Sequence, residues 1–273
     1  MIKKTIVFST ALMALFFFVH YLSFKKTPTL ALKVMTFNIG DTWNQHKLTT
    51  TEKAAAILAI IKKEGPDIVM LQEAGYLKGR LPEAIGYHSI FFKKEHVALL
   101  SRMPLKKVGE HYLDNKSGKD GEAICASTEW NGKGLLVCSA YLTSIPVAYK
   151  GKVVISKAKM LGIALRETLF DTQRVHEAED LIQWISGLGY KNVVIGGDFN
   201  SLFFFKSMRH MREKFSDTAW GTPAFWSSSH KWPQSFFPFK IDYIYVTKNM
   251  EYGGTKIIRQ SPGDHYPVVT YVR

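Results

Sequence analysis

Polar side chains able to hold a metal ion, a water molecule or a phosphate stand at the ends of several apolar stretches of this sequence. One such stretch, over 193–197, reads VVIGG and is followed by Asp198 and Asn200. A carboxylate buried alone at the end of a strand costs several kcal/mol, so it must find a partner or a metal ion. The other members of this set are Asn38, Glu73, Tyr141, Asp242, Asp264 and His265. One member alone would be explained as a turn cap, but the repetition indicates a shared site.

A divalent metal ion is the first component that these residues could bind. Mg²⁺, or Mn²⁺ in its place, prefers oxygen ligands and usually takes only one or two carboxylates from a protein, which leaves room for water and phosphate oxygens. Glu73 and Asp264 suit that role, and Asp198 suits the orientation of a water molecule that attacks phosphorus. These residue types predict metal-assisted hydrolysis of a phosphate ester.

Other members of the set suit stabilisation of the negative charge on a phosphoryl group during its transfer. His265, Asn200 and Tyr141 carry hydrogen-bond donors for that purpose. Asp242 could hydrogen-bond His265 and hold it protonated. The set therefore supplies a metal site, a base and charge-stabilising donors.

Alternating strands and helices must position these residues. A helix is predicted over 50–65, with a threonine cap before it and Gly65 as its stop, and a second amphipathic helix over 171–189. No repeat or change of composition divides the chain, so one catalytic domain is expected over 32–273. The predicted strands span 31–40, 66–73, 96–101, 192–200, 240–247 and 265–272.

The composition predicts a folded domain with a polyanionic partner. The chain has 273 residues, of which 46% are apolar, and this is enough for a sizeable core. The formal net charge of +13 favours nucleic acid or an anionic membrane surface as a partner. No obligate protein partner is evident, and we expect a monomer.

The first residues predict an anchoring or export segment. An uncharged run from Thr5 to Phe24 is about as long as a bilayer requires. We expect a hydrophobic helix in residues 1–26 that acts as an uncleaved signal anchor, followed by a linker over 27–31; the alternative is a signal peptide cleaved near Ala31. Lysines on both sides of the run leave its orientation open. Either reading predicts a catalytic domain outside the cytoplasm, periplasmic or extracellular, and membrane-anchored or secreted.

The two cysteines, Cys125 and Cys138, are expected to face each other across a hairpin. A two-residue turn at Asn131 and Gly132 would put them at directly opposed strand positions. They could pair in an oxidising compartment, but directly opposed positions suit disulfide geometry poorly. Two buried free thiols are the favoured expectation.

Five segments of the sequence resemble the motif series of the endonuclease/exonuclease/phosphatase superfamily, which has the deoxyribonuclease I-like fold. They read TFNIG, PDIVMLQE, GGDFNS, IDYIYV and GDHYPV, and they occur in the family's order. The resemblance implies a four-layer α/β/β/α sandwich of two mixed β-sheets flanked by helices, with the site where the strand ends of the two sheets meet. Carried over by position, the resemblance implies that Asn38 and Glu73 lie at the metal ion, with Asp264 nearby. It implies that Asp198 orients the attacking water and that Asn200 contacts the phosphate. Asp242 and His265 would form an acid/histidine pair.

The chain departs from one common pattern of this family. Many members carry a histidine in a THL-like motif where this sequence reads SAYLTS, with Tyr141 at the equivalent position. The tyrosine resembles the apurinic/apyrimidinic endonuclease and exonuclease III branch. A phenol with a pKa near 10 would act as a hydrogen-bond donor rather than as a proton shuttle. A buried structural tyrosine is the alternative.

The segment from Ser144 to Leu169 is both basic and apolar. It is interpreted either as a substrate-facing loop that grips phosphates or lipid headgroups, or as a plain connection that contains a helix. Arg174, on the second predicted helix, is expected to be structural or solvated rather than catalytic.

Three functions follow from these patterns. The leading hypothesis is a metal-dependent phosphodiesterase that acts as a nuclease on DNA or RNA by attack of an activated water on phosphorus. The first alternative is a membrane-associated enzyme of the same fold that acts on phospholipid or inositol phosphates. The second alternative is a surface-binding module with a decayed site, which is disfavoured because nearly every motif keeps a chemically competent residue.

Overall fold

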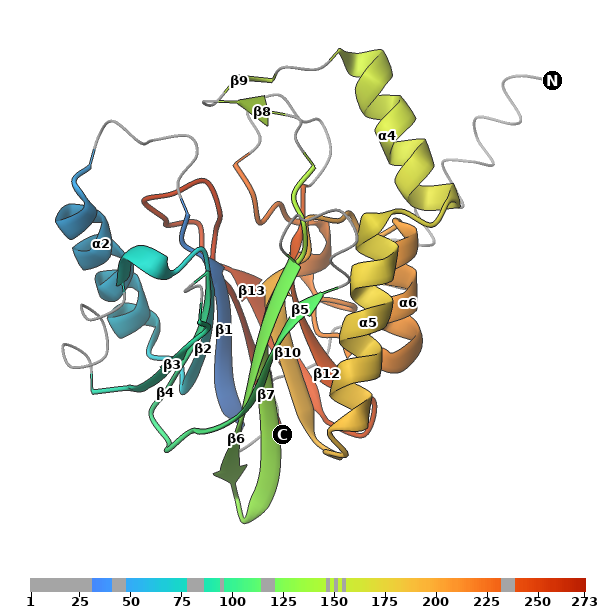
Figure 1. Ribbon diagram of the computed structural model, residues 1–273. Coiled ribbons are helices and arrows are strands. Elements are labelled where there is room, and N and C mark those ends of the chain that lie inside the picture. The colour runs from blue at the N-terminus through green and yellow to red at the C-terminus, as the bar shows by residue number, and fades with distance from the viewer. Residues whose placement is uncertain are drawn as a thin grey trace.

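Two six-stranded β-sheets lie face to face at the centre of the computed structural model (Figure 1), which describes residues 31–40, 48–77, 86–93, 96–113, 121–145, 148–149, 152–153, 156–231 and 239–273. In the first sheet the strand order is β13-β14-β1-β2-β4-β3, and only β1 and β2 run parallel to each other. Its strands are β1 (Leu32–Asn38), β2 (Ile68–Gln72), β3 (His88–Phe91), β4 (Val97–Ser101), β13 (Tyr252–Ile257) and β14 (Val268–Val272).

The second sheet has the same mixed character. Its order is β11-β12-β10-β7-β6-β5, and β10 runs parallel to β7 while the other neighbours are antiparallel. Its strands are β5 (Lys106–Leu113), β6 (Gly121–Trp130), β7 (Lys133–Tyr141), β10 (Val193–Asp198), β11 (Phe215–Asp217) and β12 (Asp242–Thr247). The short strands β8 (Ala148–Tyr149) and β9 (Lys152–Val153) pair only with each other.

Helices cover the outer faces of both sheets, which completes the four layers that the sequence resemblance implied. Helix α2 (Thr50–Glu64) packs on the first sheet, and α5 (Gln173–Gly187) with α6 (Lys206–Lys214) packs on the second (Figure 1). Short 3₁₀ turns span Gly75–Leu77 and Pro223–Trp226. The predicted sandwich is therefore confirmed, whereas the sequence did not predict α6 or four strands of the two sheets, which are β3, β5, β11 and β13.

Helix α2 forms where its sequence signals predicted it. The side chain of Thr49 accepts a hydrogen bond from the Glu52 backbone, and the Glu52 carboxylate accepts one from the Thr49 backbone. These two bonds satisfy backbone N–H groups that have no partner within the helix. Gly65 ends the helix in a left-handed conformation with φ of 57°. The helix then buries Ile57 and Ile61 against the first sheet.

The two glycines that end β10 are required by close packing. A Cβ at Gly196 would lie 2.4 Å from Cε of Met70 in the facing sheet, and one at Gly197 would lie 2.2 Å from the Ala140 carbonyl oxygen. At Gly197 the atom in the way is backbone, so a larger residue would have to move β7, whereas at Gly196 it is the flexible end of the Met70 side chain, with Cβ of Thr36 3.0 Å away. Gly196 thus lets the two sheets approach, and Gly197 lets β10 pack closely against β7, just before the strand reaches Asp198.

The cysteine expectation was half right. Asn131 and Gly132 form the turn with positive φ at both residues, and Cys125 pairs in register with Cys138. The two residues form a disulfide, however, so the expectation of free thiols was wrong. Their Cα atoms are only 4.2 Å apart, and this separation brings the two sulfur atoms within bonding reach across the hairpin.

The predicted hydrophobic helix in residues 1–26 and all of the predicted linker except Ala31 lie outside the described residues. Within the described part of the chain, no helix combines the length and apolar character needed to cross a membrane.

The segment from Ser144 to Leu169 contains a helix, as one of its two interpretations expected. Helix α4 (Lys157–Leu169) stands at the edge of the molecule near the top of Figure 1 and exposes Leu161, Leu165 and Leu169. Its attachment is a buried ion pair between Glu167 and Arg174 of α5, and Arg174 also donates to the Thr143 carbonyl. Arg174 is therefore buried and structural.

Candidate active site

Strand register brings three of the predicted site residues into one row. In the second sheet, Asp198 at the end of β10 pairs with Tyr141 of β7 on one side and with Asp242 of β12 on the other. Residues that are directly opposed on neighbouring strands present their side chains to the same face of a sheet. The row therefore displays a phenol and two carboxylates side by side at one end of the sandwich.

Asn38 connects this row to the first sheet. Its side-chain nitrogen donates to Oε1 of Glu73 at 3.0 Å and to Oδ2 of Asp198 at 2.9 Å, so one amide bridges a carboxylate from each sheet. The Asn38 side-chain oxygen accepts from the Gly40 backbone at 2.9 Å. The amide orientation is thus fixed on both sides.

His265 lies between the carboxylates of Asp242 and Asp198. Its Nδ1 is 2.9 Å from Oδ2 of Asp242, and its Nε2 is 3.8 Å from Oδ2 of Asp198. Burial alone would lower the pKa of His265, but the negative charges of Asp242 and Asp198 outweigh it and raise that pKa well above the ordinary value. The predicted acid/histidine contact is present in the structure.

The carboxyl group of Asp198 is fully enclosed. Burial raises its pKa to about 7, and the Asp242 charge adds to the rise, while His265 opposes it. The Asn200 backbone donates to Oδ1 of Asp198 at 2.9 Å. A carboxyl group that titrates near neutrality is suited to accept a proton from water and to release it again.

Tyr141 and Asn200 lie on the other side of Asp198. Burial and the charges of Glu73 and Asp198 raise the pKa of Tyr141 well above its usual range, and its hydroxyl interacts with the side chains of Ser144 and Asn200. The phenol therefore keeps its proton and can serve only as a donor or acceptor of hydrogen bonds. One N–H of the Asn200 amide donates to the Leu142 carbonyl at 2.8 Å, so the amide is held between this carbonyl and the Tyr141 hydroxyl.

Glu73 fits the role of a metal ligand. Its backbone has a positive φ of 54°, and its side chain is half-buried while the neighbouring strand residues are buried. A Cβ at Gly40 would lie 1.8 Å from Oε2 of Glu73. Because glycine has no side chain, the Glu73 carboxylate can occupy this space, which we call the Glu73 cradle. The Asn38 oxygen accepts one hydrogen bond from the Gly40 backbone and keeps a second lone pair, so it and the Glu73 carboxylate oxygens offer the hard ligands that Mg²⁺ prefers. The residues present therefore fit a magnesium-type ion.

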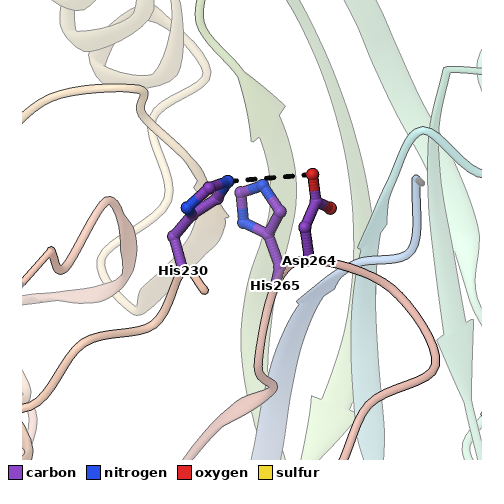
Figure 2. A group of neighbouring side chains, drawn as sticks. All are labelled: His230, Asp264 and His265. Atoms are coloured by element: carbon purple, nitrogen blue, oxygen red, sulfur yellow. Dashed lines mark ion pairs between the residues drawn. The ribbon is translucent and has the colours of Figure 1, made fainter. Parts of the chain in front are cut away.

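Asp264, the third predicted metal ligand, lies beside a histidine that the sequence reading missed. Figure 2 shows its carboxylate facing His230, whose Nε2 is 3.7 Å from Oδ2 of Asp264. Among the described residues, two groups of three ionisable ligands lie within 4.8 Å of one another: His230, Asp264 and His265, and Asp198, Asp242 and His265. Neither group includes Glu73.

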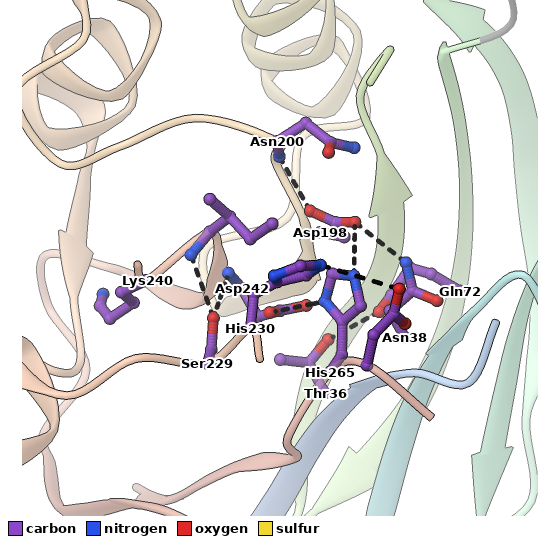
Figure 3. Close-up of polar contacts among 12 residues, drawn as sticks. Thr36, Asn38, Gln72, Asp198, Asn200, Ser229, His230, Lys240, Asp242 and His265 are labelled. Atoms are coloured by element: carbon purple, nitrogen blue, oxygen red, sulfur yellow. Dashed lines mark hydrogen bonds and ion pairs between the residues drawn. The ribbon is translucent and has the colours of Figure 1, made fainter. Parts of the chain in front are cut away.

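Ser229, the residue before His230, also supports the site through its side chain and its backbone. The Ser229 hydroxyl accepts from the backbone nitrogens of Ile241 and Asp242, each at 3.0 Å, and Figure 3 shows Ser229 beside Asp242. The Ser229 carbonyl accepts from the Tyr266 backbone at 2.6 Å. Ser229 thereby ties the strand that carries Asp242 to the loop that carries His265. No apolar strand pattern precedes Ser229 and His230, so no signal in the sequence marked them.

A buried polar layer lies beneath the site. The Gln72 side chain donates to the Ser139 hydroxyl at 3.0 Å and accepts from Thr36 at 3.3 Å (Figure 3). Ser139 in turn donates to the Leu71 carbonyl at 2.8 Å. This layer joins β1 and β2 of one sheet to β7 of the other directly below the carboxylates.

Comparison with known proteins agrees with this geometry. The model of the family described as the endonuclease/exonuclease/phosphatase family matches residues 35–265. Comparison with curated proteins gives no significant match.

Solved structures share the fold at low sequence identity. The human Nocturnin catalytic domain with a bound sulfate anion is 17% identical, with a TM-score of 0.64 over 89% of this chain and 93% of that chain. A mannosyl-6-phosphatase from Bacteroides thetaiotaomicron is 18% identical, with a TM-score of 0.66 over 89% and 99%. TDP2 of D. rerio, complexed with a single-strand DNA product, is 13% identical, with a TM-score of 0.66 over 89% and 99%.

Proposed function

The chain belongs to the endonuclease/exonuclease/phosphatase family and is a phosphoric ester hydrolase, and from this premise we propose that it is a divalent-metal-dependent phosphodiesterase that hydrolyses DNA or RNA. The observation that carries the proposal is the contact series from Glu73 through Asn38 to Asp198, which continues through His265 to Asp242. It joins a candidate metal ligand, a buried base and a paired histidine in one site.

Asp198 is the proposed general base. Its pKa of about 7 lets it take a proton from the attacking water near neutral pH, and the Asn200 backbone and the Asn38 amide hold its two oxygens in place. The water would lie against this carboxylate, in line with the scissile bond to phosphorus.

His265 is the proposed charge-stabilising donor. Because Nδ1 contacts Asp242, the proton on Nε2 is directed away from that pair toward Asp198 and the substrate side of the site. A protonated imidazole there stabilises negative charge on the phosphoryl oxygens, and the phenol of Tyr141 adds a neutral donor.

Enzymes of this family typically use a divalent metal ion, and Glu73 with Asn38 would hold it here. When bound, Mg²⁺ or Mn²⁺ supplies Lewis-acid stabilisation of a phosphate oxygen. Asp264 is the further oxygen ligand that the sequence proposed, and the packing of Gly263 against the Gly40 carbonyl supports this, because it brings the Asp264 segment beside the Glu73 cradle.

Enlarging Gly40 tests the Glu73 cradle. We expect Gly40→Ala to raise the Mg²⁺ concentration that gives half-maximal hydrolysis by about tenfold or more, because the new Cβ displaces the Glu73 carboxylate. The unfolding temperature should change little, since the atom displaced is the far end of a flexible side chain. Gly187→Ala is the control, because a Cβ there meets no atom within 4 Å. An unaltered Mg²⁺ dependence of Gly40→Ala would argue against metal binding by Glu73.

Nucleic acid is the proposed substrate because the chain carries a formal net charge of +13. The fold neighbour TDP2 was solved with a single-strand DNA product, which is consistent with that choice. The alternative, a phospholipid or inositol-phosphate substrate, is favoured by the exposed Leu161, Leu165 and Leu169 on α4.

We also propose that the enzyme works outside the cytoplasm, anchored by residues 1–26 or secreted after their removal. The disulfide between Cys125 and Cys138 supports this, since such bonds persist in oxidising compartments.

The deciding experiment offers the full-length enzyme plasmid DNA, RNA, sphingomyelin and phosphatidylinositol phosphate side by side, with Mg²⁺ and with chelator. We expect chelator-sensitive cleavage of DNA or RNA and none of the lipids. Asp198→Asn enzyme, purified in the same way, controls for contaminating nucleases. Lipid hydrolysis without cleavage of nucleic acid would replace the nuclease proposal with the alternative.

Salt should weaken binding of nucleic acid steeply. Contacts to about four phosphates would release enough counterions to lower affinity roughly 100-fold between about 50 and 200 mM salt. Binding of a labelled oligonucleotide to Asp198→Asn enzyme measures this without cleavage. A flat salt response would point to a small or uncharged substrate.

A further inference from the structure

His230, Asp264 and His265 form a cluster whose chemistry differs from that of the magnesium-type ligands Glu73 and Asn38. Two imidazoles and one carboxylate offer their ligand atoms within 4.8 Å of one another, and all three residues are buried. Figure 2 shows a ring nitrogen of each histidine on the same side as the Asp264 carboxylate. Imidazole nitrogen suits transition-metal ions, whereas Mg²⁺ prefers oxygen.

The distances in this cluster are close to those of a metal site. Ligands bound about 2.0–2.1 Å from a tetrahedral Zn²⁺ lie roughly 3.3 Å apart. His230 Nε2 and Asp264 Oδ2 are 3.7 Å apart, so a shift of a few tenths of an ångström would bring them to that spacing. The two imidazole rings pack edge to face, with their planes at 89° and their centres 4.6 Å apart, and one nitrogen of each ring lies within 4.8 Å of the other and of the Asp264 carboxylate.

The contact between Asp242 and His265 is of the kind that supports a histidine ligand in metal sites. Metal-bound histidines usually donate their other ring nitrogen to a carboxylate, which fixes the tautomer and raises the basicity of the ligand. Nδ1 of His265 makes this contact with Asp242, and Nε2 is then the nitrogen that can bind a metal. The buried Asp242 thus serves as the supporting carboxylate of a histidine ligand.

The backbone fixes the positions of the three ligands. His230 and His265 face each other in an antiparallel bridge, and the Lys231 backbone donates to the Asp264 carbonyl at 2.7 Å. Little chain ordering would accompany metal binding, because these hydrogen bonds already hold both segments together.

We propose that His230, Asp264 and His265 form a binding site for a divalent transition-metal ion of the Zn²⁺ class, which shares Asp264 with the magnesium-type site but does not include Glu73. Water or substrate would complete the coordination, since three protein ligands leave a tetrahedral ion one open position. Zn²⁺ bound there would occupy Nε2 of His265 and the carboxylate of Asp264. If the enzyme is the phosphodiesterase proposed above, Zn²⁺ would therefore inhibit its Mg²⁺-dependent turnover.

Direct metal binding tests this proposal independently of catalysis. Full-length, chelator-treated enzyme is titrated with Co²⁺, which reports coordination by its visible absorption, and with Zn²⁺ in a calorimeter. We expect saturable binding of Zn²⁺ at this site in wild-type enzyme. His230→Gln should weaken it by about 100-fold or more, and Asp242→Asn by about 10- to 100-fold. His88→Gln, which changes an exposed histidine on β3, is the matched control and should bind like wild type.

A ligand exchange provides a signature that a merely structural histidine would not give. His230→Cys should retain Co²⁺ and add a near-ultraviolet charge-transfer band, because a thiolate would then coordinate the ion. Wild-type affinity for Zn²⁺ in a folded His230→Gln enzyme would overturn the proposal, and so would a Co²⁺ spectrum of His230→Cys without that band. Binding without inhibition of hydrolysis would uphold the metal site and refute only its link to the proposed function.

Discussion

Asp198→Asn is expected to lower kcat by about 10³- to 10⁴-fold while leaving the Kd for nucleic acid within a few fold of wild type. The amide keeps the shape of the carboxylate but cannot take a proton from water, and loss of a general base typically costs up to about 10⁴-fold. The measurement is single-turnover cleavage of a labelled oligonucleotide together with equilibrium binding.

The Asp198→Asn enzyme should also remain folded. Its side-chain oxygen can still accept from the Asn38 amide or the Asn200 backbone, and the substitution removes a charge from a fully enclosed position. Asp180→Asn, on α5 beside His111, makes the same chemical change away from the site and should retain full turnover. A kcat within tenfold of wild type in Asp198→Asn would exclude this carboxylate as the base.

His265→Ala is expected to lower kcat by about 10³-fold, because it removes the charged donor proposed for the phosphoryl oxygens. Asp242→Asn should lower kcat by a smaller but still large factor. Its role is to orient His265 and to hold its charge through the 2.9 Å contact at Nδ1. Both variants are compared by kcat and KM on one oligonucleotide substrate.

The double variant separates a shared role from two independent ones. If Asp242 acts through His265, Asp242→Asn should add less than about threefold to the loss already caused by His265→Ala. Multiplicative losses would mean that Asp242 contacts the substrate or a metal ion by itself. His88→Ala controls for the loss of an imidazole elsewhere on the protein.

Much of this site could be anticipated because its residues follow apolar runs. Asp198, Asp242 and Tyr141 were identified as strand-end residues, and strand pairing then places them in one row. Their relation to Asn38 was not predictable from periodicity. It depends on how closely the two sheets approach, which the packing of Gly196 against Met70 sets.

Ser229 and His230, which the sequence did not mark as site residues, lie in a segment without hydrophobic periodicity. Ser229 and His230 occur in a run of serines and aromatics without alternation, so their importance comes only from long-range contacts with Asp242 and Asp264. For the cysteine pair, the position of the two residues could be predicted but the bond between them could not. Register was predicted from the turn, but disulfide formation depends on backbone distances that a sequence does not specify.

The left-handed backbone at Glu73 and Asn200 has a consequence for protein engineering. Among the residues that the structure describes, Asn131 in a hairpin turn is the one other non-glycine residue with positive φ. Asparagine tolerates this conformation, but glutamate does so at a cost of about 1 kcal/mol, which glycine would avoid. A mutant library ranked only by melting temperature would therefore favour the loss of Glu73. If Glu73 binds the metal ion as proposed, such a ranking would discard activity in exchange for stability.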